Sequence, residues 1–278
     1  MMQAKVDWLS MTFPLTESIA GEGGRPVSEI VFESVNQYID AVALATMCEG
    51  QPEELGGRAP YSNSWGWHDG SVRFFVGEKV DTVLLEMSGR GCDAVRALGI
   101  WTEVFDAAPV RATRLDVAVD IECPARPIDF VGAGMNERFK STGLYNSDSG
   151  QTVYIGSQKS EQFCRVYRYA PPHPRSHLLR VEYVLRRDHA KAVAKALRYG
   201  ALPDVVKALG DRYKWQSQWW EPEDAEYAEI GVERPEARRK NAVRWLITQV
   251  APAFQRLVRE GNIADPNSFL EEYFLKGI

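Results

Sequence analysis

The sequence predicts an α+β protein with a central antiparallel sheet, helices on one face of that sheet and a helical C-terminal region. Three observations support this prediction. Up to about residue 188, strand-like segments alternate between apolar and polar residues. Two of these segments, 72–77 and 82–87, flank a GEKVD turn that is typical of antiparallel strands. From Ala190 onward, helical periodicity replaces the alternation.

The N-terminal part begins with a strand over residues 5–13 (KVDWLSMTF). Residues 35–47 (VNQYIDAVALATM) have the apolar spacing of a helix, whereas residues 50–70 combine Gly, Pro, Ser, Asn and aromatic residues and predict a loop. The antiparallel pair 72–77 and 82–87 comes next.

The central part continues with a helix over 92–106, a strand over 114–121 and a helix over Asp129–Phe139. Three further strands are expected near 151–156, 163–169 and 178–187. The C-terminal region predicts helices over 190–199, 202–210, 235–259 and 267–275. Pro252 should break or kink the third of these helices. The change from strands to helices predicts a boundary between a domain 1–188 and a helical region 189–278.

The composition is that of an ordinary globular protein, with 45% hydrophobic and 26% charged residues. No apolar run approaches the roughly 20 residues that a membrane span needs. The N-terminus lacks the long apolar core of a signal peptide, so we expect a cytoplasmic protein without a membrane partner. The four cysteines lie far apart, without a CxxC pair, and predict free thiols rather than a zinc site.

The net charge of −5 argues mildly against a nucleic-acid partner, but positive charge is concentrated locally. Seven Arg or Lys residues against two acids lie between Arg175 and Arg198, and five against one lie between Arg234 and Arg244. Such clusters can form a phosphate-binding track. They can equally be solvated helix faces.

Each of the best-defined strands has one apolar side and one side with an unusual polar residue. On strand 114–121 the polar side carries Asp116 and Asp120, with Ala118 between them. The corresponding residues of the other strands are Glu86, Tyr167 and Glu182. Three carboxylates and a tyrosine on neighbouring strands could hold a divalent metal beside a nucleophile. This arrangement suits phosphoryl transfer and favours nicking of DNA.

A purely structural interpretation also exists, since exposed cross-strand pairs of arginine and acid are common. Two observations favour a site. Aspartate is depleted in strand interiors, yet Asp116 lies in mid-strand among strong strand formers. The pattern also recurs on all of the central strands.

Three segments carry a resemblance to a known family: TRLDVAVD (113–120), TVYIGSQKS with FCRVY (152–167) and LRVEYVLRRD (179–188). Together they resemble the replication initiation factor family. It includes initiators of rolling-circle plasmids, relaxases of integrative conjugative elements and replication proteins of filamentous phages. The opening DWLSMTF and the GRGC segment are similar to the phage and prophage members. The resemblance covers residues 5 to 190 and implies a Rep/relaxase-like sheet domain.

The resemblance implies roles for five residues. Tyr167, in an Arg-x-Tyr step, would be the nucleophile, and Arg165 would orient the phosphate or lower the pKa of the phenol. The metal ligands would be Asp116, Glu182 and Glu86, and the metal Mg²⁺ or Mn²⁺.

Other residues would support these roles. Asp120 would be a further ligand or would hold the ligands in place, and Lys159 would act as Arg165 does. Family members usually have an acidic or amide residue and then Lys after the tyrosine. This chain has Arg168 and Tyr169 instead, which makes Tyr169 an alternative nucleophile. Tyr154 is a third candidate, better suited to packing or substrate positioning.

The proposed chemistry requires these residue types. A phenol has a pKa near 10, so it needs a neighbouring cation or metal to attack at neutral pH. The products would be a 5′-phosphotyrosyl enzyme and a free 3′-OH. Many rolling-circle nickases hold their metal with a His–hydrophobic–His pair, which is missing among the four histidines of this chain. The resemblance therefore implies an all-carboxylate site. The spacing of His173 and His177 suits metal ligands only on a helix, and Pro174 between them predicts a loop.

Aromatic and basic residues suggest contacts with DNA. Trp65 and Trp67 would stack on unpaired bases if exposed, or fill the core if buried. The basic residues expected to contact DNA are Arg186, Arg187, Arg238, Arg239 and Lys240.

The sequence thus predicts a rolling-circle initiator or relaxase that nicks one strand of origin DNA, single-stranded or melted. A host helicase would unwind the DNA from the nick. Two alternatives stay open: an origin-binding protein of the same fold without activity, and a metal-dependent hydrolase of small phosphoesters. The sequence does not distinguish plasmid, phage and conjugative elements, and it leaves a homodimer open.

Overall fold

The structure is a computed structural model. It describes residues 2–16, 19, 26–106, 112–134, 142–147, 150–213, 215, 220, 230, 251–263 and 265–270. The chain forms two compact units, Met1–Val232 and Glu233–Ile278. The described part contains no helix that combines the length and apolar character needed to cross a membrane.

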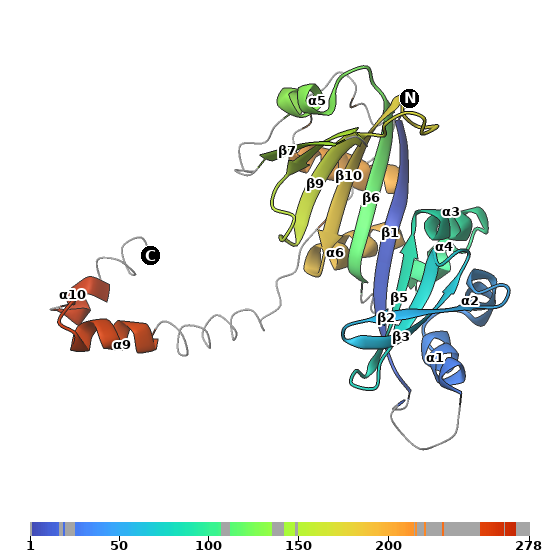
Figure 1. The fold of residues 1–278 in the computed structure, drawn as a ribbon, viewed down its shortest axis with the longest axis horizontal. Helices are drawn as coiled ribbons and strands as arrows, with labels where there is room; N and C mark the ends of the chain where they lie inside the picture. Colours follow the sequence, from blue (N-terminus) through green and yellow to red (C-terminus); the bar gives the residue numbers. More distant parts are fainter. Residues whose placement is uncertain are drawn as a thin grey trace. The chain divides into compact units, whose positions relative to one another are not determined.

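One antiparallel sheet of ten strands organises the first unit, as predicted (Figure 1). Its spatial order is β2-β3-β4-β5-β1-β6-β10-β9-β8-β7. The strands are β1 Met2–Pro14, β2 Glu53–Arg58, β3 Tyr61–Trp67, β4 Val72–Val76, β5 Thr82–Ser88, β6 Ala112–Glu122, β7 Thr142–Ser147, β8 Gly150–Ile155, β9 Gln162–Arg168 and β10 Leu178–Arg186.

The long strand β1 joins the two halves of this sheet, because it pairs with β5 on one side and β6 on the other. Its register against β6 shifts between Val6 and Trp8, so Asp7 is an extra residue in the strand. This is a β-bulge, which increases local twist and re-aims the neighbouring side chains.

The helices of the first unit are α1 Val27–Asn36, α2 Ala41–Met47, α3 Gly89–Ala97, α4 Trp101–Asp106, α5 Pro127–Gly134, α6 Asp188–Tyr199 and α7 Leu202–Tyr213. They cover the apolar face of the sheet, where alternate residues such as Leu115, Val117 and Val181 are fully buried. The phenol of Tyr183 is also buried there, and its oxygen accepts a hydrogen bond from Trp215 Nε1 at 2.6 Å. Burial of these side chains supplies the main stabilisation of the sheet.

The α6 and α7 helices pack against the sheet and therefore belong to the first unit. The boundary between the compact units lies at Val232, not at the predicted residue 188. In the second unit the structure describes α9 Ala251–Arg259 and α10 Pro266–Leu270. Pro252 lies in α9, and the predicted break or kink of a helix over 235–259 falls on residues before Ala251 that lie outside the described part of the chain.

The structure confirms the predicted strands near 5–13, 72–77, 82–87, 114–121, 151–156, 163–169 and 178–187. It also confirms the helices over 190–199 and 202–210. The predicted helix 92–106 is two helices, because Gly99 takes a left-handed conformation with φ of 72° between α3 and α4. The predicted helix 35–47 is likewise interrupted. Its second half, α2, begins after Asp40, whose carboxylate accepts hydrogen bonds from two backbone N–H groups of the first turn.

The prediction of a loop over residues 50–70 is wrong, because most of this segment forms the hairpin β2–β3. Its glycines and serines resemble loop composition, yet they suit close backbone contact. A Cβ atom on Gly57 would lie 2.2 Å from the backbone of Ser62. Pairing of β3 with β4 then adds the hairpin to the sheet.

Candidate functional site

The polar face of β6, β10 and β9 gathers the predicted residues of the phosphoryl-transfer site. Across β10 and β9, Glu182 lies opposite Arg165 and Arg180 lies opposite Tyr167. Across β10 and β6, Arg180 also lies opposite Asp120. Residues that are directly opposite on one face interact closely, so the register alone places a tyrosine, two acids and two arginines side by side.

Glu182 is the centre of this group, although only 1% of its side chain is exposed. Its Oε2 accepts a hydrogen bond from Tyr167 Oη at 3.0 Å and another from Arg165 Nε at 2.8 Å. Its Oε1 accepts one from Arg165 Nη2 at 2.5 Å. A carboxylate that accepts from a fork of arginine donors is strongly held in place.

The Tyr167 phenol is protonated in this environment. Burial raises its pKa well above the ordinary value, and the charge of Glu182 and a hydrogen bond with Tyr169 raise the pKa further. The positive charge of Arg180 acts in the opposite direction. A reaction at this phenol would therefore require the loss of its proton, and Glu182 is the acceptor within hydrogen-bonding distance.

Asp116 lies on β6, one strand from Glu182, and only 1% of its side chain is exposed. Arg114 donates to both of its oxygens, at 3.0 and 2.5 Å. Burial raises the pKa of Asp116 to about 7 despite this arginine, and the charge of Glu182 adds to the increase. Asp116 therefore changes its charge near neutral pH.

Glu86 does not join this pair. It lies on β5, and β1 and β6 separate it from Glu182 on β10. Three strand spacings of about 4.8 Å exceed the reach of one ion's coordination shell. Glu86 instead accepts hydrogen bonds from Ser10 Oγ at 3.1 Å and from Arg58.

Mg²⁺ and Mn²⁺ prefer oxygen ligands, which the carboxylates on this face could supply. Within the described ranges, no group of three His, Cys, Asp or Glu side chains is arranged to hold a metal ion. Mg²⁺, however, is commonly bound by one or two carboxylates together with water and substrate phosphates. Asp116 and Glu182 fit such a partial site, and Glu86 does not share it.

Arg180 is a member of the site that the sequence reasoning missed. Its side chain is buried and donates to both oxygens of Asp120, at 2.6 and 2.7 Å, and to Asp7 at 3.4 Å. Asp120 therefore holds Arg180, which in turn lies beside Tyr167. The available signal was the position of Arg180 two residues before Glu182, which puts both on the same face.

The remaining supporting residues lie at different distances from Tyr167. The ring of Tyr169 is 5.3 Å from that of Tyr167, at 81°. Tyr154 lies opposite Arg165 on β8, and its ring contacts that of Tyr145 at 5.2 Å. Lys159 is exposed in the turn before β9, and the five residue steps from Gln162 to Tyr167 alone span about 17 Å. Lys159 is thus too far away to assist the phenol.

The predicted DNA contacts divide into three groups. Trp67 is buried against Phe32 and Phe74, and Trp65 packs against the same core, so both fill the apolar side of the sheet rather than offering a stacking surface. Arg186 holds the turn before β9 through Gln158 and Ser160, and Arg187 pairs with Glu161 at 3.4 Å. The residues that fall outside the described part of the chain are Arg238, Arg239 and Lys240.

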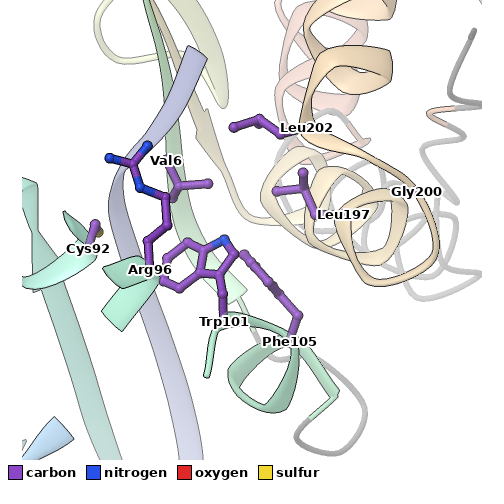
Figure 2. A pocket seen from close by; sticks show the side chains of 8 residues that line it. All are labelled: Val6, Cys92, Arg96, Trp101, Phe105, Leu197, Gly200 and Leu202. Carbon is purple, nitrogen blue, oxygen red and sulfur yellow. The ribbon is translucent and has the colours of Figure 1, made fainter. Parts of the chain in front are cut away.

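A cavity of about 300 Å³ opens on the helix-covered side, away from these residues (Figure 2). Trp101 and Phe105 of α4 face Leu197 and Leu202 across it. The rest of its lining is formed by Val6, Cys92, Arg96 and Gly200. None of the predicted catalytic or metal-binding residues lines this cavity.

The comparisons with known proteins find a structural relative. No family model and no curated protein matches the sequence. A solved structure, the rolling circle replication initiator protein from Geobacillus stearothermophilus, is similar with a TM-score of 0.55 and 19% identity. The match covers 83% of this chain and 94% of that chain. The two chains therefore share a fold over most of their lengths.

Proposed function

We propose that this protein initiates rolling-circle replication by nicking one strand of origin DNA through Tyr167. The observation that carries the proposal is the hydrogen bond from Tyr167 Oη to Glu182, flanked by Arg165 and Arg180. The shared fold with a rolling circle replication initiator supports the same class of reaction. The substrate would be single-stranded or melted origin DNA, and a host helicase would act from the nick.

The residues suggest the following course of reaction. Glu182 accepts the phenolic proton while Tyr167 Oη attacks the phosphorus atom of a phosphodiester. The bond from phosphorus to the 3′ oxygen breaks, and that oxygen takes a proton from water. The products are a 5′-phosphotyrosyl enzyme and a free 3′-OH. The covalent bond retains the energy of the phosphodiester, so the strand can later be rejoined.

The two arginines have distinct parts in this scheme. Negative charge grows on the phosphate as the bond to Tyr167 forms, and fixed cations stabilise it. Arg165 has about a third of its side chain exposed, so it can turn donors toward a bound phosphate. Arg180 is buried and beside Tyr167, so it stabilises the phenolate as the proton leaves.

A divalent cation such as Mg²⁺ or Mn²⁺, held by Asp116 and Glu182, would polarise the scissile phosphate. Its binding requires the ionised form of Asp116. Without the cation the pKa of Asp116 is about 7, so below neutrality the cation would have to displace a proton from this carboxyl group. For the cation to bind, Arg114 and Arg165 would have to release some of their hydrogen bonds to these carboxylates.

The proposal is tested by mixing the protein with a single-stranded origin oligonucleotide and Mn²⁺. A covalent protein–DNA adduct should appear on a denaturing gel, and Tyr167→Phe should abolish it. Tyr169→Phe is the matched control, because it removes a neighbouring phenol and should leave the adduct. An adduct that survives Tyr167→Phe but disappears in Tyr169→Phe would move the nucleophile to Tyr169.

One observation favours a second candidate, an origin-binding protein without nicking activity. The carboxylates of Asp116, Asp120 and Glu182 each already accept two hydrogen bonds from one arginine. This candidate predicts tight origin binding with no adduct in the same experiment. Turnover of a small phosphoester that is insensitive to Tyr167→Phe would instead indicate a hydrolase.

A further inference from the structure

A column of aromatic rings continues from Tyr167 to the protein surface. The Tyr169 ring meets the Tyr167 ring edge to face, with 5.3 Å between centroids and 81° between planes. The His173 ring then lies parallel to the Tyr169 ring, 3.9 Å away at 14°. His173 is exposed. The outer ring of the column is therefore available to a further flat group.

The orientation of His173 is set before any ligand arrives. Its Nδ1 accepts a hydrogen bond from the backbone N–H of Arg175 at 3.1 Å. The backbone N–H of His173 donates to the carbonyl of Ala170 at 3.1 Å. The backbone carbonyl of His173 accepts from the backbone N–H of Ser176 at 2.9 Å. A ring that is held by the backbone loses little conformational entropy on stacking, which favours binding.

The segment 170–177 that carries His173 is also anchored to the rest of the unit. Arg168 donates to the carbonyl of His177 at 2.7 Å and to that of Ala125 at 3.0 Å. Arg175 reaches Asp120 at 3.4 Å, while 43% of its side chain is exposed. This arginine can therefore offer further donors to a phosphate beside the column.

We propose that His173, supported by the Tyr169 ring stacked beneath it, forms a stacking site for one unpaired nucleobase next to the phosphate that Tyr167 attacks. The inference rests on the proposed function and adds a base-binding subsite to it. Bases of single strands stack readily on aromatic side chains and on histidine. Every base has a flat face, so stacking by itself selects an unpaired base rather than a particular one. The subsite would fix the position of the strand relative to Tyr167.

The test uses the full chain with Tyr167→Phe, so that DNA binds without being cleaved. Origin oligonucleotides carry 2-aminopurine at one position at a time, because stacking on an aromatic ring quenches its fluorescence. We expect quenching at one position adjacent to the scissile phosphate. Adding His173→Ala should remove that quenching and weaken binding about five-fold or more, whereas His173→Phe should retain both.

His177→Ala is the matched control, because it removes an exposed histidine of the same segment and should leave quenching unchanged. Thermal unfolding of the His173→Ala and His177→Ala proteins should coincide, which shows that the fold is intact. DNA binding with unchanged quenching in His173→Ala would overturn the subsite and leave the nicking proposal standing. If the unmodified protein, which retains Tyr167, neither bound the origin oligonucleotides nor formed an adduct with them, both proposals would be overturned.

Discussion

In the proposed reaction Glu182 accepts the proton of Tyr167, and it is also the counter-charge of Arg165. Glu182→Gln keeps the size of the side chain but removes its charge. We expect adduct formation to slow by about 100-fold or more, since proton transfer to a positioned base typically contributes that much. The rate of adduct formation is measured by stopping the reaction at successive times and separating the samples on a denaturing gel.

The control for this variant is Glu78→Gln, which changes an exposed glutamate in the turn between β4 and β5. It should nick at the rate of the unmodified protein. A Glu182→Gln protein that folds normally and nicks at full rate would show that another group, or water, takes the phenolic proton.

Asp116 should make stability depend on pH in an unusual direction. Its pKa is about 7 in the folded state and close to 4 when unfolded, so the folded state binds more protons between these values. Stability is therefore greatest below about pH 4 for this group and is lost as the pH rises to about 7. The full effect is on the order of 4 kcal/mol.

Urea unfolding at pH 5 and pH 8 measures this effect. The unmodified protein should lose stability relative to Asp116→Asn as the pH rises, because the variant has no carboxyl group to ionise. A difference between the two proteins that is independent of pH would contradict the raised pKa of Asp116.

At the scale of elements, the β2–β3 hairpin depends on one close backbone approach. In Gly57→Ala the new Cβ would lie 2.2 Å from the backbone of Ser62, so the hairpin must open. We expect a loss of about 1–3 kcal/mol in the free energy of unfolding. Gly56→Ala is the neighbouring control, because its Cβ would meet nothing within 4 Å.

Both variants are compared by urea unfolding, followed by the adduct assay. The hairpin lies on the β5 side of β1, away from Tyr167 on β9. Gly57→Ala should therefore lower stability without changing the nicking rate at a temperature where it is folded. Equal stability of the two variants would show that the hairpin does not need the close approach.

The strands also show where the local sequence was sufficient to predict secondary structure. Strands β6, β9 and β10 are confirmed because each alternates with a period of two and carries β-branched or aromatic residues. The β2 and β3 strands were missed because their glycines and serines are typical of loops. They are strands because β2 pairs with β3 and β3 pairs with β4.

At the scale of the whole molecule, the compact unit extends beyond the sheet itself. A chain that ends at Val232 keeps α6 and α7 on the apolar face and should fold and form the adduct. A chain that ends at residue 188 exposes core residues such as Leu115 and Tyr183 and should aggregate. Expression, circular dichroism and the adduct assay compare the two truncations.

A folded and active 1–188 protein would show that the sheet does not require α6 and α7. A 1–232 protein that folds but fails to bind origin DNA would instead assign DNA binding to residues 233–278. Those residues include the basic cluster around Arg238, Arg239 and Lys240, whose predicted role is tested in this way.

The sequence by itself determined which residues share a face of each strand, because the alternation of side chains is a local property of the backbone. That was sufficient to place Asp116, Glu182, Arg165 and Tyr167 on polar faces. The order and register of the strands were decided only by the tertiary structure. They put β1 and β6 between Glu86 and Glu182, and they put Arg180 opposite Tyr167. A period of two repeats identically along every strand, so it cannot specify which strands are neighbours or how they align.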